Sequence, residues 1–193
     1  MANIDRPNGF RPHKDSTGKP YNGQMVKMNG ATNLFLGDAV IAHTAGAGKY
    51  QSCTRATAGD GSEIILGVVV GWDANPDGLS DKYYTASDDI AVYICTDPDM
   101  SYVVQGDGAG TVVITSEDIG KNLDFVIAAG STTTGASNME VDESVTGVTT
   151  VGTPLHLLGL LDSPDNAETA NVKCVVKFNM HAYGVLDGMT TGV

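Results

Sequence analysis

Residues 171–180, NVKCVVKFNM, alternate apolar and polar side chains with a period of two. Successive side chains of a β-strand point to opposite faces, so this period separates the two kinds. One face would carry Val172, Cys174, Val176, Phe178 and Met180. The other would carry Lys173, Lys177 and Asn179. The pattern predicts a strand that covers a hydrophobic core on one side and meets solvent on the other.

Related signals recur along the chain as short runs rich in β-branched or aromatic residues, each bounded by turn residues. They predict further strands at 38–43, 62–72, 89–95, 100–105, 111–115, 123–129 and 154–161. No segment keeps an apolar period of about 3.6 residues long enough for an amphipathic helix. The fold class predicted is therefore all-β, a β-barrel or a jelly-roll-like sandwich of short strands.

Two segments depart from this pattern. Residues 1–27 are rich in proline, glycine and basic residues, and we interpret them as an extended basic N-terminal arm. Residues 28–193 are then a single β domain. Within it, residues 131–153 are rich in Ser, Thr and Gly. A loop of more than roughly 15 residues without structure of its own is unusual in a compact domain. We expect them to form a protruding flap or hairpin.

The charge is distributed unevenly between arm and body. The formal net charge is −12, but residues 1–27 hold five basic and two acidic residues, whereas residues 28–193 hold six basic and 21 acidic ones. An acidic body repels phosphate backbones, so we expect no nucleic-acid partner. No run reaches the roughly 18 apolar residues of a membrane span, and the N-terminus lacks the apolar region of a signal peptide. We expect no membrane association and no export by a signal peptide.

The cysteines, Cys53, Cys95 and Cys174, are odd in number and far apart, and they are expected to be buried thiols. Residues 73–78, DANPDG, match the first half of a calcium loop, but Tyr84 stands where a bidentate Glu is needed. A plain turn is the better interpretation.

The sequence contains no mutually positioned acid, base and nucleophile that would indicate catalysis. The four histidines do not lie at metal-ligand spacing from other ligating residues. We predict a protein that is not an enzyme and has no metal or cofactor. A metal-assisted hydrolase using Asp73 and Asp77 is kept as an alternative hypothesis.

Several stretches, taken in order, resemble the capsid cement or decoration proteins of tailed bacteriophages. They are MANIDRPNGFRP (1–12), DAVIAH (38–43), ATAGDGSEIILGVVVGW (56–72), YICTDPDMSYVVQ (93–105), DIGKNLDFV (118–126), GASNMEVDES (135–144), LLGLLDSPDNAE (157–168) and VKCVVKFNMHAY (172–183). In that family an Asp-Pro-Asp turn follows a strand, as at 97–99, and the last strand ends in an Asn-x-His pattern, as at Asn179 and His181. The resemblance covers nearly the whole chain.

This resemblance implies a structural role in the virion. Copies would bind the outside of an icosahedral head at contacts between capsomers and stabilise the shell. The implied partners are the major capsid protein and further copies of the chain, as a homodimer or homotrimer. The implied location is the capsid exterior of a virion assembled in the host cytoplasm, and the implied fold is again a β-barrel or jelly-roll-like domain.

The residues expected to bind a partner lie in the arm. Arg6, Phe10, Arg11, Lys14 and Lys19 combine positive charge with one aromatic anchor. An extended segment of this kind can add to an exposed sheet edge of a partner through main-chain hydrogen bonds. The acidic partner would be the capsid protein or the body of a neighbouring copy. The simpler interpretation is a solvated, disordered tail.

A second functional class is a head fibre or another virion surface module that binds a host receptor or carbohydrate. The segment 131–153 and the aromatic residues Trp72, Tyr83 and Tyr84 motivate it, because exposed aromatic rings stack on sugars. Aromatic residues make up only 6% of the chain, which weighs against this alternative.

Overall fold

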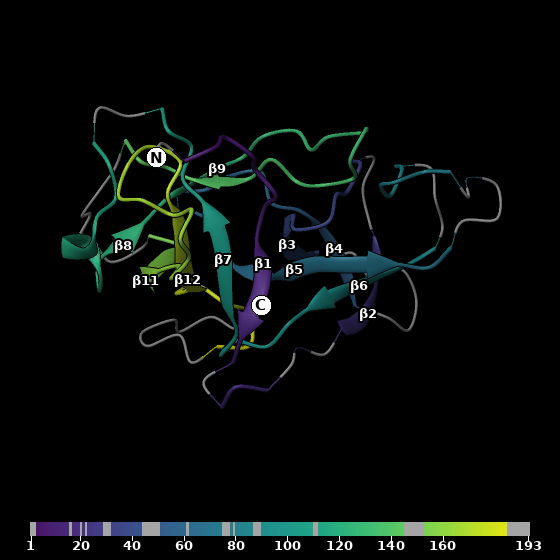
Figure 1. Cartoon of the computed structure of the whole chain (residues 1–193). Helices are drawn as coiled ribbons and strands as arrows, with labels where there is room; N and C mark the ends of the chain where they lie inside the picture. The colour runs from purple at the N-terminus through teal and green to yellow at the C-terminus, as the bar shows by residue number, and fades with distance from the viewer. Residues whose placement is uncertain are drawn as a thin grey trace.

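The computed structural model describes residues 3–15, 17–19, 21, 23–28, 32–43, 51–60, 62–74, 78, 80–86, 90–109, 112–144 and 153–184. The chain is built almost entirely of β-strands, which confirms the predicted fold class. Its strands form a five-stranded sheet, a closed barrel and a two-stranded ribbon. In Figure 1 the sheet lies on the left and the barrel on the right.

The five-stranded sheet is antiparallel, with the order β1-β7-β12-β11-β8. Its strands are Arg11–Lys14 (β1), Ser101–Gln105 (β7), Lys173–Phe178 (β12), Leu155–Leu160 (β11) and Asn122–Leu123 (β8). The alternation predicted for 171–180 is confirmed from Val172 to Phe178, whose even-numbered side chains are buried. This sheet therefore has one face on the core, as its period-two strands require.

The barrel closes in the order β2-β4-β3-β5-β6. Its strands are Gly23–Met28 (β2), Ser52–Arg55 (β4), Ala39–His43 (β3), Ile65–Trp72 (β5) and Ala91–Cys95 (β6). All neighbouring pairs are antiparallel except β2 and β4. The three cysteines are free and buried, as expected.

The strand β5 connects two hydrophobic clusters. Leu66 and Val69 belong to the cluster of the barrel, together with Val26 of β2. Ile65 and Val68 belong to the larger cluster beneath the five-stranded sheet. Successive side chains of a strand point to opposite faces, and the register shift in the pairing of β5 with β3 brings Ile65 and Val68, three positions apart, to the same side. Sheet and barrel are thus joined by shared core residues.

The segment expected to protrude is partly built into the domain. Glu140–Val141 (β10), inside the segment, pairs with Phe125–Val126 (β9), which precedes the segment, as an antiparallel ribbon. Its connecting residues do not stand free, however, because Ala136 forms a bridge with Leu36 and Met139 is fully buried. Residues 145–152 of the expected flap lie outside the described residues.

Other expectations need correction. Residues 112–115 form no strand, and the run from 123 to 129 supplies only the short β9 and part of β8. Among the described residues, Ser116–Asp118 form the one helical segment, a 3-10 helix (η1). In the part of the chain that the structure describes, no helix is long and apolar enough to cross a membrane.

Candidate interaction surface of the N-terminal arm

The segment interpreted as a free arm is folded onto its own chain. β1 is an edge strand paired with β7, and β2 is part of the barrel, so a domain boundary at residue 27 would cut through β2. Neither strand carries a long apolar run, and their pairing partners lie far along the chain. Tertiary contacts, rather than local propensity, therefore make these residues strands.

The expected role of Phe10 needs the most important correction. The sequence analysis expected its ring to anchor a partner, but the ring packs into its own chain. Its side chain is 0% exposed and lies in the core beneath the five-stranded sheet. Its ring centroid lies 5.0 Å from that of Phe178, 5.3 Å from Phe125 and 6.3 Å from Tyr102. A buried aromatic cluster of this kind is a major source of packing energy. Phe10 holds the arm against the body.

The backbone at Phe10 approaches the body closely. The Phe10 N–H donates to the carbonyl of Gly37 at 2.9 Å. Gly9 has φ +63°, and a Cβ added there would lie 2.5 Å from the Gly37 oxygen and from Cβ of Ser137. Only glycine fits this conformation and this space. The Asn-Gly pair at 8–9 is a turn signal that sequence reasoning overlooked.

The beginning of the arm is held by Asn3, which the sequence analysis did not single out. Its amide nitrogen donates to the carbonyls of Ala167, Ala170 and Thr169 at 2.8, 3.1 and 3.3 Å. Its amide oxygen accepts from the Ala167 N–H at 2.9 Å. Farther along, the Arg6 N–H donates to Oε1 of Gln105 at 3.2 Å. The arm thus has three anchors: the Asn3 clamp, the Phe10 ring and the β1 ladder.

The basic side chains of the arm remain on the surface. Arg6, Lys14 and Lys19 are exposed, and Arg11 is half-buried, so that burial lowers the pKa of its guanidinium. Among the described residues, none of these four forms an ion pair with an acidic side chain. They give the outer side of the arm a positive charge, as the sequence predicted, while the body is acidic.

The Glu140 carboxyl group responds to the arm and its surroundings. Burial, followed by the negative charges of Asp5, Asp107 and Glu143, raises the pKa of Glu140 to about 7. Asp5 belongs to the arm, so the arm brings a like charge toward a carboxyl group that is already partly buried. The Glu140 side chain therefore gains its negative charge near neutral pH, close to the Asp5 carboxylate of the arm.

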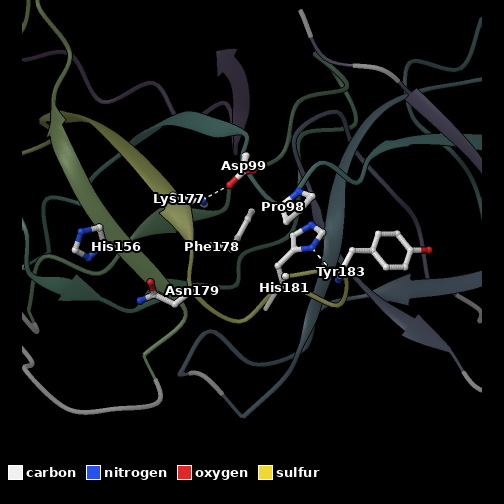
Figure 2. A pocket seen from close by; sticks show the side chains of 9 residues that line it. Pro98, Asp99, His156, Lys177, Phe178, Asn179, His181 and Tyr183 are labelled. Carbon is white, nitrogen blue, oxygen red and sulfur yellow. Dashed lines mark hydrogen bonds and ion pairs between the residues drawn. The ribbon is translucent and has the colours of Figure 1, made fainter. Parts of the chain in front are cut away.

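A separate cavity of about 420 Å³ lies beside the ends of β11 and β12. Figure 2 shows His156 and Asn179 on one side of it and Pro98 and His181 on the other. The polar groups at its edge bind other groups of the protein: Lys177 Nζ lies 2.6 Å from Asp99 Oδ1, and His156 Nδ1 lies 3.1 Å from Asn122 Oδ1. These contacts fix the walls of the cavity.

The aromatic residues considered for sugar stacking are placed differently from that expectation. Tyr84 is buried in the barrel cluster, Tyr83 stacks on Phe35 with ring centroids 5.2 Å apart, and Trp72 packs partly against the barrel cluster. Of the two proposed metal ligands, Asp73 accepts a hydrogen bond from the Tyr93 hydroxyl at 2.7 Å, and Asp77 lies outside the described residues.

Within the described residues, no group of three or more His, Cys, Asp or Glu side chains is placed to hold a metal ion. The arm combines buried anchors with exposed basic side chains, and we therefore take its outer side as the candidate interaction surface. No protein-family model matches the chain, and neither a curated protein nor a solved structure shows significant similarity to it.

Proposed function

We propose that the chain is a non-enzymatic virion structural protein that binds the outside of a tailed-bacteriophage head at contacts between capsomers and stabilises the shell. The observation that supports this most is the ordered set of family-like motifs, read together with where those motifs lie. They cover both the strands and the turns that connect them.

Two of these motifs illustrate the point. The Asp-Pro-Asp turn after β6 is closed by the Met100 N–H, which donates to the Asp97 carbonyl, and it brings Asp99 to Lys177 of β12. The Asn179 amide nitrogen donates to Asn122 Oδ1 and to the carbonyls of Thr153 and Leu155 at 3.0 to 3.2 Å. Both motifs hold together strands that are distant in the sequence. The resemblance therefore rests on residues that support the fold, which fits a structural protein.

The charge distribution supports the same proposal. Cement proteins must stay soluble until their docking surface appears, and a strongly acidic body opposes self-association. The exposed basic groups of Arg6, Lys14 and Lys19, which form no ion pair within the described residues, would then meet an acidic surface on the major capsid protein or on another copy. Charge complementarity of this kind speeds association and orients the partners.

The test is to mix the purified chain with empty heads of its source phage and measure co-sedimentation. We expect saturable binding at a fixed ratio to the capsid protein. Reversing charge at Arg6, Lys14 and Lys19 to Glu should weaken binding, whereas Lys82→Glu, at an exposed lysine outside residues 1–27, should not. Deleting the arm is a poor test, because it would also remove Phe10 from the core.

A second measurement needs no variant. Mass spectrometry of purified virions should find the chain in hundreds of copies. Only a few copies per virion would favour the alternative of a head fibre, and absence from virions together with no binding to heads would refute the proposal.

A further inference from the structure

The part of the arm that ends with β1, residues 3–14 and called the arm from here on, lies in a groove that can be defined by its contacts. This acceptor groove comprises the edge of β7, the aromatic pocket around Phe10 and the turn at 166–170 that binds Asn3. We infer that the acceptor groove takes the arm of a second copy of the chain, so that neighbouring subunits exchange arms. This inference goes beyond the proposed function, because it rests on contacts between the arm and the acceptor groove and not on binding to a virion.

The arm contacts would be unchanged by exchange. Asn3 binds the turn 166–170, Arg6 binds Gln105, and Arg11 lies opposite Val103 in the β1–β7 ladder. Each of these partners lies far from the arm in sequence, and an identical set exists in every other copy. Exchange therefore keeps these interactions and alters chiefly the link between arm and body.

That link binds mainly to itself. β1 ends at Lys14 and β2 begins at Gly23. Asp15 Oδ1 accepts the Thr17 and Lys19 N–H groups at 2.9 and 2.6 Å, and the Gly18 N–H donates to the Asp15 carbonyl. Within the described residues 15, 17–19 and 21, every hydrogen bond found stays inside Asp15–Lys19.

Opening this turn would give the arm a long reach. The eight residues between the two strands span up to roughly 27 Å when extended. The hydrogen bonds lost are those of one exposed turn, whose groups can bind water instead. When the corresponding segment of a second copy fills the groove with the same contacts, this turn is the part of the link that exchange has to open.

Two surface features favour a second copy as the partner. Tyr21 and Met25, which flank the start of β2, are 46% and 42% exposed and would be covered where two bodies meet at the crossing links. The basic side chains of Lys14 and Lys19 lie at this link and would pass between two acidic bodies. Their charge would reduce the repulsion between the bodies.

Simple extension of the sheet is a weaker way to join two copies. β1 is the free edge, but it holds Pro12, which has no N–H to donate, and ends in the charged Lys14. Proline and lysine on an edge strand oppose the addition of another strand. The inner edge of the acceptor groove, the β7 side, is therefore a better site for another copy than the outer edge of β1.

The test uses two variants, Arg11→Cys and Val103→Cys, each made in a chain whose native Cys53, Cys95 and Cys174 are replaced by Ala so that the new cysteine is its single thiol. The two variants are unfolded together and refolded under mildly oxidising conditions. Arg11 and Val103 are paired in the ladder, and the Cα atoms of such partners lie about 4.5–5.5 Å apart, within reach of a disulfide. Exchange predicts a covalent pair containing one chain of each variant. The control mixes Arg11→Cys with Ile119→Cys, an exposed position near β8 at the opposite edge of the sheet.

A heterodimer in the test mixture but not in the control supports exchange. The double variant in one chain gives the complementary result: exchange links chains together, whereas a cross-linked monomer would overturn the inference. If Val103→Cys does not fold, Lys14→Cys with Ser101→Cys provides a second ladder pair.

Light scattering on the unmodified chain completes the test. Exchange requires a mass of at least two chains, and a monomer at all concentrations would overturn it. Failure of head binding with successful cross-linking would refute the proposed function alone, and the reverse result would refute arm exchange alone.

Discussion

Asn3 and Ala167 bind each other reciprocally: the Asn3 amide nitrogen donates to the Ala167 carbonyl at 2.8 Å, and the Ala167 N–H donates to the Asn3 amide oxygen at 2.9 Å. These residues are 164 positions apart. The contact fixes the start of the arm to the turn that precedes β12, the strand next to β7. One side chain thus helps decide whether the arm stays in its groove.

Replacing Asn3 with Ala should release the start of the arm while the domain remains folded. The side chain makes several hydrogen bonds, and their loss should cost about 1–2 kcal/mol of unfolding free energy. Amide hydrogen exchange in residues 3–9 should increase more than exchange in β12. Asn8→Ala is the matched control, because the one hydrogen bond found for its side chain among the described residues is a long 3.4 Å contact with the Arg6 carbonyl. Equal exchange in both variants would show that the clamp is unimportant.

Replacing Phe10 with Ala should destabilise the whole protein. The side chain is fully buried among three aromatic rings, and truncation of such a residue typically costs about 3–5 kcal/mol. Thermal and urea unfolding would measure the loss. Ile4→Ala, an apolar arm residue that is 73% exposed, should change stability little. If the two variants unfolded alike, Phe10 would not be part of the core.

Gly9 and Gly18 separate two effects of glycine substitution. Both have positive φ, +63° and +76°, so alanine is strained at either position. A Cβ at Gly9 would clash with Gly37 and Ser137, whereas a Cβ at Gly18 meets nothing within 4 Å. Gly9→Ala should therefore lower the midpoint of chemical unfolding clearly more than Gly18→Ala. Equal losses would mean that backbone conformation alone matters at the entry of the arm.

The strands that sequence patterns could predict are those with a buried face of their own. β12 alternates apolar and polar residues, and its buried side chains are those of the predicted face. β4 and β1 have the sequences SCTR and RPHK, which carry no strong strand signal. They form because neighbouring strands pair with their backbone N–H and C=O groups. The residues of those neighbouring strands, rather than their own, determine that they are strands.

The same limit explains the arm. The charges of Arg6, Lys14 and Lys19 could be predicted to face solvent from their types alone. The burial of Phe10 could not, since its pocket is assembled from Tyr102, Phe125 and Phe178, more than 90 residues away. A single aromatic residue in a Pro- and Gly-rich segment has no periodic pattern to reveal its partners.

Stability should decline from mildly acidic to neutral pH through Glu140. Folding raises its pKa from 4.5 to about 7, so the folded state favours the protonated form. That contribution is present below pH 4.5 and is lost as the pH rises through about 7. Solvent screens this partly exposed group, so the effect should be on the order of 1 kcal/mol. Glu140→Gln should flatten this part of a melting-temperature profile, whereas Asp81→Asn, at an exposed position, should not. An unchanged profile for Glu140→Gln would contradict the assignment.

His181 should give the opposite slope at lower pH. The ring is 2% exposed, and burial lowers its pKa from 6.5 to about 4, with Lys177 acting in the same direction and Asp97 opposing it. The Tyr183 N–H donates to Nδ1 at 3.1 Å, which assigns the proton of the neutral ring to Nε2. Protonation of the ring would place its second proton on Nδ1, where it would face the Tyr183 N–H donor. Stability from neutral His181 is therefore present above pH 6.5 and is lost as the pH falls through about 4.

The full shift corresponds to at most about 3 kcal/mol. NMR titration of the His181 ring should show almost no protonation at pH 5.5, with a short histidine-containing peptide as the control in the same buffer. Urea unfolding between pH 6.5 and 4 should show decreasing stability in Glu140→Gln, where the opposing contribution of Glu140 has been removed. A His181 ring that titrates near 6.5 would contradict this prediction, because its burial against β5 would then impose no cost on the charged form.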